Sequence, residues 1–415
     1  MSDTALDRGG VYGMRMTEFS RALAKRGHEV VLLAPRGATN QPDHHRSFKG
    51  AGTLRTVTLN RTPTLYKQVH QRFEDHPIAQ KAVTAASLLF LGGTDPGWTR
   101  AICKEAPSIL FDVKPDLIWA TFGSLSTLSG AKSMAKAAKC PWVIDLKDNT
   151  ELYIPRAVRG HVARQFSSAH AITSNSSFHG DIGSRWLKRG HTVVYSGVSE
   201  RSPVRIEEII RNRSFQISLV GSVYCDQALN VFLKTLAVWV SNRSQFDRAK
   251  IRVRYCGNDF ERVRRHFARV QMPCSWHATG NIQHDEFLRV CQSSAVNCYI
   301  WAPFTFHHKS LELVAIGQPV VSFRGEHPET LRLANEIGGT LISCPDEHTV
   351  TKTLDRVWTD WKSHHQTFCS IDCKDLTWAV GAERLEALFD AVLAGERKIS
   401  RAWIAGFQTA QVRSS

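Results

Sequence analysis

The feature that most limits how this chain can fold is a repeated alternation of short apolar runs with longer segments of helical spacing. In the first half, strands are predicted at Glu29–Ala34, Asp116–Thr121, Trp142–Leu146, Ala169–Ser174 and Thr192–Tyr195, and helices at Met14–Lys25, Ala79–Leu91 and Leu125–Ala138. In the second half, strands are predicted at Phe215–Val220, Ile251–Tyr255, Ala295–Tyr299 and Pro319–Phe323, and helices at Asp259–Val270, Asp285–Ser293 and Ser310–Ile316. Strands that alternate with helices imply βαβ units and parallel sheets. The sequence therefore predicts an α/β protein with two Rossmann-like domains facing a cleft.

A polar and charged stretch separates the two halves, and a chain of 415 residues suits two domains of ordinary size. We place the N-terminal domain at residues 1–197, a linker at 198–213 and the second domain at 214–376. Residues 377–395 are predicted to form a last helix, and residues 396–415 a basic tail. The stretch 35–110 is less regular and is expected to hold long helices.

The net charge of +15 requires an anionic partner or another explanation. The basic residues are spread along the chain and form no nucleic-acid-binding motif, so we expect no nucleic acid partner and favour an anionic membrane surface. The ten cysteines have no paired metal spacing, and the first residues have no signal-peptide pattern. We therefore expect a cytoplasmic protein with reduced thiols, and peripheral binding to the inner face of the membrane as a further possibility.

The most informative local pattern is the segment 306–321, which is predicted to run from a loop through a short helix and a Gly turn into an apolar strand. Lys309, Ser310 and Glu312 cluster where that helix begins. A helix start offers N–H groups and a partial positive charge, which attract phosphate. A nearby lysine adds a full charge, and a carboxylate one turn away can accept hydrogen bonds from sugar hydroxyls.

This segment resembles the donor-site segment of retaining glycosyltransferases of the GT-B fold, family 4 type, which reads K-x-x-E-x-x-A-x-G-x-P-V-V/I. The matching residues are Lys309, Glu312, Ala315, Gly317, Pro319, Val320 and Val321. The opening L-A-x-x-G-H-E-V of the same family matches residues 23–30. The resemblance implies that a sugar is transferred from a nucleoside diphosphate sugar to a saccharide or lipid-linked acceptor, with retention and without a cofactor or metal. It also implies that the last helix crosses back to the first domain.

The resemblance assigns donor-side roles to particular residues. Lys309 would contact the diphosphate and Glu312 the ribose hydroxyls, and these two are the candidate catalytic residues. Family members often carry Gly-Arg after the first strand of this domain and a lysine soon afterwards, whereas this chain has Gly221-Ser222 and then Gln227. The further donor-binding candidates are Gly221, Ser222, His307, His308, Ser310 and Leu311 around the phosphates, with Gly280 and Ile282 near the base.

On the acceptor side, the resemblance assigns a Gly-rich loop and a strand end. Gly9, Gly10 and Gly13 are expected to lie in a loop before the first helix, although a simple turn is an equally good interpretation. Lys147 and Asp148 follow the strand Trp142–Leu146 in a segment similar to P-W-V/I-x-D/E-L/F-R/K-D of some exopolysaccharide glycosyltransferases. They would contact the acceptor, and a solvated loop with a local ion pair is the alternative.

Two departures from the family leave alternatives open. A first strand normally precedes the Gly loop, but only eight residues precede Gly9 here, so we expect an apolar strand to be encoded upstream of Met1. The first carboxylate of the family's E-x7-E signature is replaced by Phe304. A GT-B epimerase that acts on a UDP-sugar and a catalytically impaired binding subunit therefore remain as alternatives.

Overall fold

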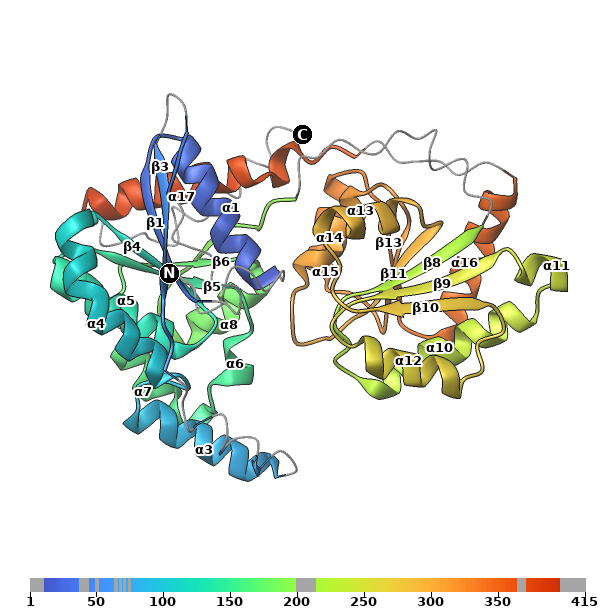
Figure 1. Cartoon of the computed structure of the whole chain (residues 1–415), viewed down its shortest axis with the longest axis horizontal. Helices are drawn as coiled ribbons and strands as arrows, with labels where there is room; N and C mark the ends of the chain where they lie inside the picture. The colour runs from blue at the N-terminus through green and yellow to red at the C-terminus, as the bar shows by residue number, and fades with distance from the viewer. Residues whose placement is uncertain are drawn as a thin grey trace. The chain divides into compact units, whose positions relative to one another are not determined.

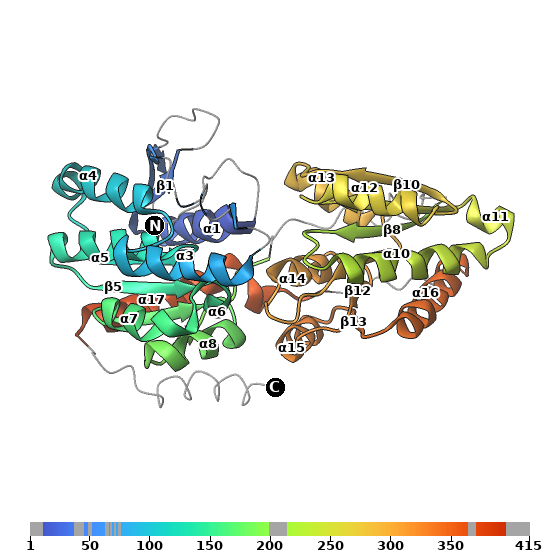
Figure 2. The same ribbon diagram turned by 90° about the horizontal axis from the view of Figure 1, so that it is seen from below.

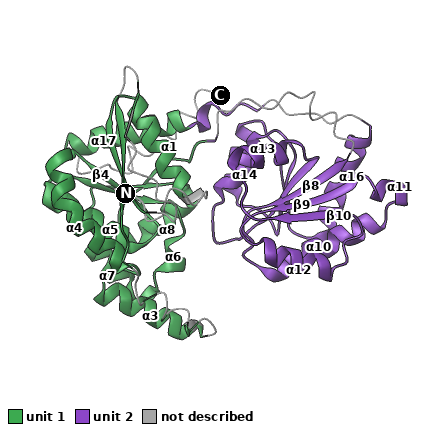
Figure 3. Ribbon diagram, viewed as in Figure 1, with its two compact units in different colours: residues 1–197, 378–415 green, residues 198–377 purple. Residues whose placement is uncertain are grey.

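The computed structural model describes residues 11–36, 45–48, 52–62, 66, 69, 72–73, 76–198, 214–363 and 371–395. The chain divides into two compact units, Met1–Gly197 with Trp378–Ser415 and Val198–Thr377 (Figure 3). The predicted linker lies almost wholly outside the described residues, as do the predicted basic tail and the candidates Gly9 and Gly10. None of the described helices is long and apolar enough to span a membrane.

The second unit is built on one parallel sheet with the strand order β10-β9-β8-β11-β12-β13 (Figure 1). The strands are β8 (Phe215–Val220), β9 (Ile251–Cys256), β10 (Ser275–Thr279), β11 (Val296–Ile300), β12 (Val320–Phe323) and β13 (Leu341–Cys344). This is the order of a Rossmann sheet, in which the direction of strand addition reverses between the first and fourth strands. The reversal lies here between β8 and β11, and ligands of such sheets bind at the carboxyl ends of those strands.

Helices lie on both sides of this sheet (Figure 2). They are α10 (Asp226–Ser241), α11 (Gln245–Arg248), α12 (Phe260–Arg269), α13 (His284–Gln292), α14 (His308–Ala315), α15 (Pro328–Glu336) and α16 (Glu347–Lys362), followed by a 3-10 turn at Lys374–Leu376. Residues from the strands and the helices share one buried core. In this core the Phe215 ring meets the Trp358 ring edge to face, with 5.0 Å between the ring centroids. Burial of such rings is the main stabilising term for the unit.

The described strands of the first unit form two sheets instead of one. Strands β4 (Ile118–Phe122), β5 (Trp142–Leu146), β6 (Ala171–Ser174) and β7 (Thr192–Val193) are parallel and adjacent in that order. Strand β1 (Glu29–Pro35) is parallel to β3 (Thr53–Leu59), which pairs antiparallel with β2 (His45–Ser47). Figure 1 shows β1 and β3 running at a steep angle to β4 and β5.

A comparison of the two units locates the break between these sheets. In the second unit, β9 and β11 flank the central strand β8, whereas no described strand lies between their counterparts β1 and β4. The break is therefore at the position where the sequence predicts that a first strand is missing. Leu33 and Val57 from one sheet nevertheless share a buried cluster with Ile118 and Phe122 from the other.

The helices of this unit are α1 (Val11–Lys25), α3 (Pro77–Phe90), α4 (Pro96–Val113), α5 (Leu125–Ala138), α6 (Thr150–Tyr153), α7 (Arg159–Gln165), α8 (Ser177–Leu187) and α17 (Trp378–Leu393), with a 3-10 turn at Arg156–Val158. The last helix packs on the first, where Phe19 meets Trp378 edge to face at 5.0 Å between ring centroids. At the exposed end of this contact, His28 Nε2 lies 2.7 Å from a carboxylate oxygen of Glu386.

One sequence expectation for this unit was wrong, and a second was incomplete. Helix α1 begins at Val11, three residues earlier than predicted, so Gly13 lies buried inside the helix and not in a loop before it. The stretch 35–110 holds the expected long helices α3 and α4, and it also contains strands β2 and β3, which the sequence did not predict. The apolar residues Leu54, Val57 and Leu59 lie on the buried side of β3, but two adjacent polar residues, Arg55 and Thr56, interrupt the alternation that is typical of a strand.

A buried ion pair attaches α1 to the sheet. The Arg15 guanidinium donates to both carboxylate oxygens of Asp145 in β5, at 2.7 and 3.0 Å, and to the carbonyl of Val194 at 2.9 Å. Asp145 also accepts hydrogen bonds from the hydroxyls of Thr173 and Thr121 at 2.7 and 3.0 Å. Burial opposes ionisation of Asp145, but Arg15 and these hydrogen bonds outweigh that effect and hold its pKa below the ordinary value.

Removing one member of this pair should destabilise the first unit strongly. We expect Arg15→Met to lower the free energy of unfolding by about 3–5 kcal/mol, because the Asp145 carboxylate would remain buried without its cation. Denaturant unfolding followed by tryptophan fluorescence would measure the change. Arg21→Met on the same helix removes a half-exposed ion pair with Glu18 and should cost less than about 1 kcal/mol. Equal costs for the two variants would contradict the assigned role of Arg15.

Candidate functional site

The candidate site lies at the carboxyl ends of β8, β9, β11 and β12 in the second unit. Its central contact joins the loop after β8 to the start of α14, where the Lys309 side chain lies against the backbone of Gly221. A Cβ atom at residue 221 would lie 2.3 Å from Lys309 Nζ. The sequence-predicted lysine is therefore brought to the point of strand-order reversal, where a parallel α/β sheet holds its ligands.

Glycine is required at residue 221 for two reasons. Its φ of +83° is a conformation that other residues rarely adopt, and the space beside its Cα is filled by the lysine. The next strand supports this close approach, since the Tyr255 hydroxyl donates to the Gly221 carbonyl at 2.7 Å. A Cβ at Gly257 would in turn lie 2.6 Å from that carbonyl. Two glycines thus allow two loops and a cation to meet closely.

The surroundings of Lys309 are apolar and acidic. Its Nζ lies 5.5 Å from the centroid of the Tyr299 ring, which is close enough for a cation–π interaction. Burial lowers the pKa of Lys309 from 10.5 to about 8, against the opposing influence of Glu326 and Asp259. No salt bridge of Lys309 is present among the described residues. The ammonium is thus charged at neutral pH without a bound carboxylate, as a phosphate-binding group should be.

Glu326 and Tyr299 form a second polar group that the sequence did not predict. The Tyr299 hydroxyl donates to the Glu326 carboxylate, which also accepts from the Ser322 hydroxyl at 3.0 Å and from the His327 N–H at 2.8 Å. Burial and the neighbouring carboxylate raise the pKa of Tyr299 well above its ordinary value. The signal that could have found Glu326 is its position after the apolar strand β12, at the ligand-binding end of the sheet.

Glu312 lies one turn along α14 from the start of the helix and is buried. Burial raises the pKa of its carboxyl group from 4.5 to about 7. The nearest basic group is His308, whose Nε2 lies 3.9 Å from a carboxylate oxygen of Glu312. A buried carboxyl group with a raised pKa beside a site lysine is typical of a functional residue, because desolvation of this kind costs stability.

The two histidines before Lys309 contribute packing. The His307 ring stacks on Tyr224 with 5.6 Å between centroids and meets Tyr299 edge to face at 6.2 Å, so it joins the loops after β8 and β11. The Ala302 N–H points at His307 Nε2 at 3.4 Å. Within the described part of the chain, no three His, Cys, Asp or Glu side chains are grouped so as to hold a metal ion.

The other donor-side candidates differ in their burial and in the loops that carry them. Ser310 is buried and its hydroxyl donates to the His307 carbonyl, while Leu311 is buried, so its side chain is not exposed to a ligand. Ser222 is partly buried directly after Gly221. Gly280 and Ile282 follow β10, the edge strand beyond β9, and their loop is joined to the loop after β9 by a hydrogen bond from Asn281 to Asn258.

The acceptor-side candidates belong to the first unit. Lys147 is buried directly after β5, and its carbonyl accepts a hydrogen bond from Asn175 at 2.9 Å. Asp148 is partly buried, and Asn149 caps α6 by accepting from the Glu151 N–H at 3.0 Å. The segment therefore forms a tight turn at the carboxyl end of β5, which is the ligand-binding end of that sheet.

Comparisons with known proteins identify the architecture. No family model and no curated protein matches this sequence. Among solved structures, the chain is similar to an alpha,alpha-trehalose-phosphate synthase (UDP-forming) from Burkholderia vietnamiensis, with a TM-score of 0.63, 14% identity and coverage of 95% of this chain and 98% of that one. The fold is GT-B.

Two further solved structures agree with this fold. A synthase of the same type from Burkholderia xenovorans, in complex with glucose-6-phosphate, has a TM-score of 0.62 at 12% identity and covers 94% of this chain and 98% of its own. An E. coli trehalose-6-phosphate protein bound with UDP-2-fluoro glucose has a TM-score of 0.56 at 13% identity, with 99% and 97% covered. These similarities support the GT-B fold that the sequence predicts, but not the family 4 type in particular.

The raised pKa of Glu312 predicts that this residue destabilises the folded chain. Its pKa of about 7 lies above the ordinary 4.5, so the folded form loses stability as pH rises between these values, and the loss is complete above about pH 7. At 1.36 kcal/mol for each unit of pKa, the full loss is up to about 3 kcal/mol. We expect Glu312→Gln to raise the free energy of unfolding at pH 8 and to change it little at pH 5.

Denaturant unfolding at the two pH values would measure this difference. The control is Glu336→Gln on α15, which alters a half-exposed carboxylate paired with Arg332 and should show no such pH dependence. A Glu312→Gln protein that is less stable than the unmodified chain at pH 8 would show that the carboxylate is stabilised by hydrogen bonds in the free protein.

Proposed function

We propose that this chain is a glycosyltransferase that moves a sugar from a nucleoside diphosphate sugar to an acceptor hydroxyl, with retention at the anomeric carbon. The observation that carries the proposal is the contact of the Lys309 ammonium with Gly221 at the point of strand-order reversal. A cation held against bare backbone at the start of a helix fits a diphosphate, because the ammonium, the glycine backbone and the helix start can face the same anion. The GT-B fold and the family 4 resemblance support the same reaction.

In the proposed mechanism, the diphosphate lies over Gly221 and the start of α14. Lys309 stabilises the negative charge that grows on the departing diphosphate, and Glu312 holds the ribose hydroxyls. The acceptor hydroxyl attacks from the face that the diphosphate leaves, and no residue of the site is required as a covalent nucleophile. Pre-positioned charges of this kind are a large source of rate enhancement.

The chain lacks the two cations that family members often place around the diphosphate. Ser222 and the exposed Gln227 stand near those positions, so Lys309 carries most of the charge that faces the phosphates. A single cation makes the reaction depend strongly on the ionisation of that residue. The site therefore predicts an unusually clear pH dependence.

We expect kcat/KM for the donor to follow a bell-shaped pH profile with its maximum between about pH 7 and 8. The acid limb reports ionisation of Glu312, and the alkaline limb reports loss of the proton from Lys309. Lys309→Arg should remove the alkaline limb, because a guanidinium stays charged throughout this range. Lys309→Ala should lower kcat/KM by a factor that corresponds to a loss of about 2–4 kcal/mol in transition-state stabilisation. Unchanged turnover in this folded variant would contradict the proposal.

The test of the function itself is release of nucleoside diphosphate from a panel of UDP- and GDP-sugars, with and without saccharides or a lipid extract. Acceptor-dependent release of the diphosphate together with a glycosylated product would support the transferase. An epimerase would convert a UDP-sugar without any acceptor. A catalytically impaired binding subunit would bind the donor and release nothing.

We also propose that the acceptor is a saccharide or a lipid-linked saccharide reached at an anionic membrane surface. The net charge of +15 supports this placement, since basic proteins are attracted to anionic lipid headgroups. We expect sedimentation with vesicles that contain anionic lipid, and loss of this binding at high salt, because ions screen surface charge. Equal binding to neutral vesicles, or binding to neither kind, would contradict the placement.

A further inference from the structure

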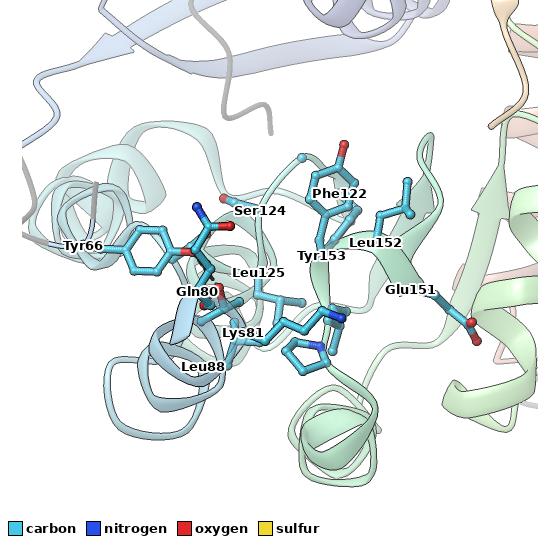
Figure 4. Close-up of a pocket in the computed structure, with 15 residues that line it drawn as sticks. Tyr66, Gln80, Lys81, Leu88, Phe122, Ser124, Leu125, Glu151, Leu152 and Tyr153 are labelled. Atoms are coloured by element: carbon cyan, nitrogen blue, oxygen red, sulfur yellow. Dashed lines mark hydrogen bonds between the residues drawn. The ribbon is translucent and has the colours of Figure 1, made fainter. Parts of the chain in front are cut away.

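A pocket of about 510 Å³ opens in the first unit, and none of the candidate site residues named above is among its described lining residues (Figure 4). It lies at the carboxyl end of β4, where Gly123 and Ser124 form one edge. Helix α3 supplies another wall, and the segment 151–155, which includes the last three residues of α6, supplies a third. The carboxyl edge of a parallel sheet is where α/β proteins hold their ligands, and the volume suits one or two sugar rings.

The base of the pocket is apolar and its walls are aromatic. Leu88, Leu125 and Ile154 are buried beneath it. Figure 4 shows Tyr66 on one side of the pocket and Tyr153 on the other. The Tyr153 ring is held by an edge-to-face contact with Phe122, at 6.0 Å between centroids. Two aromatic side chains on opposite sides of an apolar base can hold the apolar face of a flat ligand.

Several polar groups that line the pocket are neutral and can form hydrogen bonds. The Tyr66 hydroxyl lies 3.0 Å from the Thr84 hydroxyl, and burial raises the pKa of Tyr66 so that it keeps its proton. Gln80 and Ser124 also line the pocket and add an amide and a hydroxyl group. Hydroxyl and amide groups can both donate and accept, which is what recognition of sugar hydroxyls requires.

The charged groups at the pocket do not favour an anion. Lys81 is the sole cation among the described lining residues, and its side chain is exposed. The Glu151 carboxylate is directed away from the pocket in Figure 4 and lies 2.9 Å from the Arg159 guanidinium. A site for a sugar phosphate would require cations or helix N–H groups directed at the phosphate.

We propose that this pocket binds the acceptor of the transfer reaction, and that the acceptor is a neutral glycoside with an apolar aglycone rather than a sugar phosphate. The proposal rests on the proposed function. In the reaction, an acceptor hydroxyl oxygen forms a bond to the anomeric carbon of the donor sugar as the bond from that carbon to the diphosphate breaks. The diphosphate leaves with the electron pair, and the hydroxyl proton passes to the departing phosphate oxygen.

Binding can be tested without turnover by calorimetric titration of the full chain. The probes are the phenyl β-glycosides of glucose, galactose and mannose, with glucose 6-phosphate as the charged comparison. We expect at least one phenyl glycoside to bind with a single site and more tightly than glucose 6-phosphate. Failure of all three to bind, or tighter binding of glucose 6-phosphate, would overturn the proposal.

Variants locate the binding. Tyr153→Ala removes one aromatic wall and should weaken phenyl glycoside binding roughly five- to tenfold. Ser124→Trp should abolish binding by filling the pocket. The matched control is Phe111→Ala, which removes an exposed ring of α4 outside the pocket and should leave affinity unchanged. Unchanged affinity in both pocket variants, with thermal unfolding as the check of folding, would place the ligand elsewhere.

Kinetics separate failure of this proposal from failure of the function. With transfer to a phenyl glycoside established, Tyr153→Ala should raise KM for that acceptor several-fold and leave KM for the donor unchanged. Transfer with unaltered acceptor KM in the variant would retain the transferase and reject the pocket. Pocket-dependent binding by a protein that transfers no sugar would retain the pocket and reject the transferase.

Discussion

The candidate site depends on one close approach, that of the Lys309 ammonium to the backbone of Gly221. Two conditions must hold for it to form. Residue 221 must have no side chain and must accept a positive φ, and α14 must begin immediately beside the end of β8. The Rossmann strand order meets the second condition, because it places β11 and the helix that follows it next to β8. In the sequence, residues 221–295 separate these two strands. The hydrogen bond from Tyr255 to the Gly221 carbonyl fixes the glycine in place.

Burial of the same residues creates an energetic conflict. Desolvation lowers the pKa of Lys309 and raises that of Glu312, so each group is less readily charged in the folded protein than in water. A structure selected for stability alone would place neutral side chains at both positions. Retaining a lysine and a carboxylic acid on neighbouring turns of one short helix is easier to explain if a ligand restores their charged forms. Functional sites commonly carry strain of this electrostatic kind.

The first unit is held together in a different way, because its described strands form two separate sheets. A shared apolar cluster, with Leu33 and Ile118 from opposite sides of the break, joins the two sheets. The Arg15–Asp145 ion pair adds a directional link between α1 and β5. Hydrophobic burial is non-directional, so a fixed pair of charges is well suited to set the orientation of the helix on the sheet. The pocket beside Ser124 lies at the carboxyl edge of the sheet that this pair orients.

The sequence determined the elements whose signals are local. It predicted α5, β5 and β8 with their observed bounds and α17 to within two residues, because apolar periodicity and glycine or proline boundaries act over a few residues. It also singled out Lys309 and Glu312, whose spacing is set by one helical turn. It failed for Gly13, where the helix begins earlier, and for β3, whose alternation is interrupted by polar residues.

Only the tertiary structure decided which distant residues meet. The partnership of Arg15 with Asp145, of Lys309 with Gly221, and of Glu326 with Tyr299 depends on strand order and on loops that converge at one edge of a sheet. The pocket lined by Tyr66, Ser124 and Tyr153 likewise joins segments that carry no shared motif. Periodicity reports which face of an element is buried, but it carries no information about the neighbour that buries it. That neighbour is chosen by the packing of the whole sheet, so the chemistry of the site became visible only in the fold.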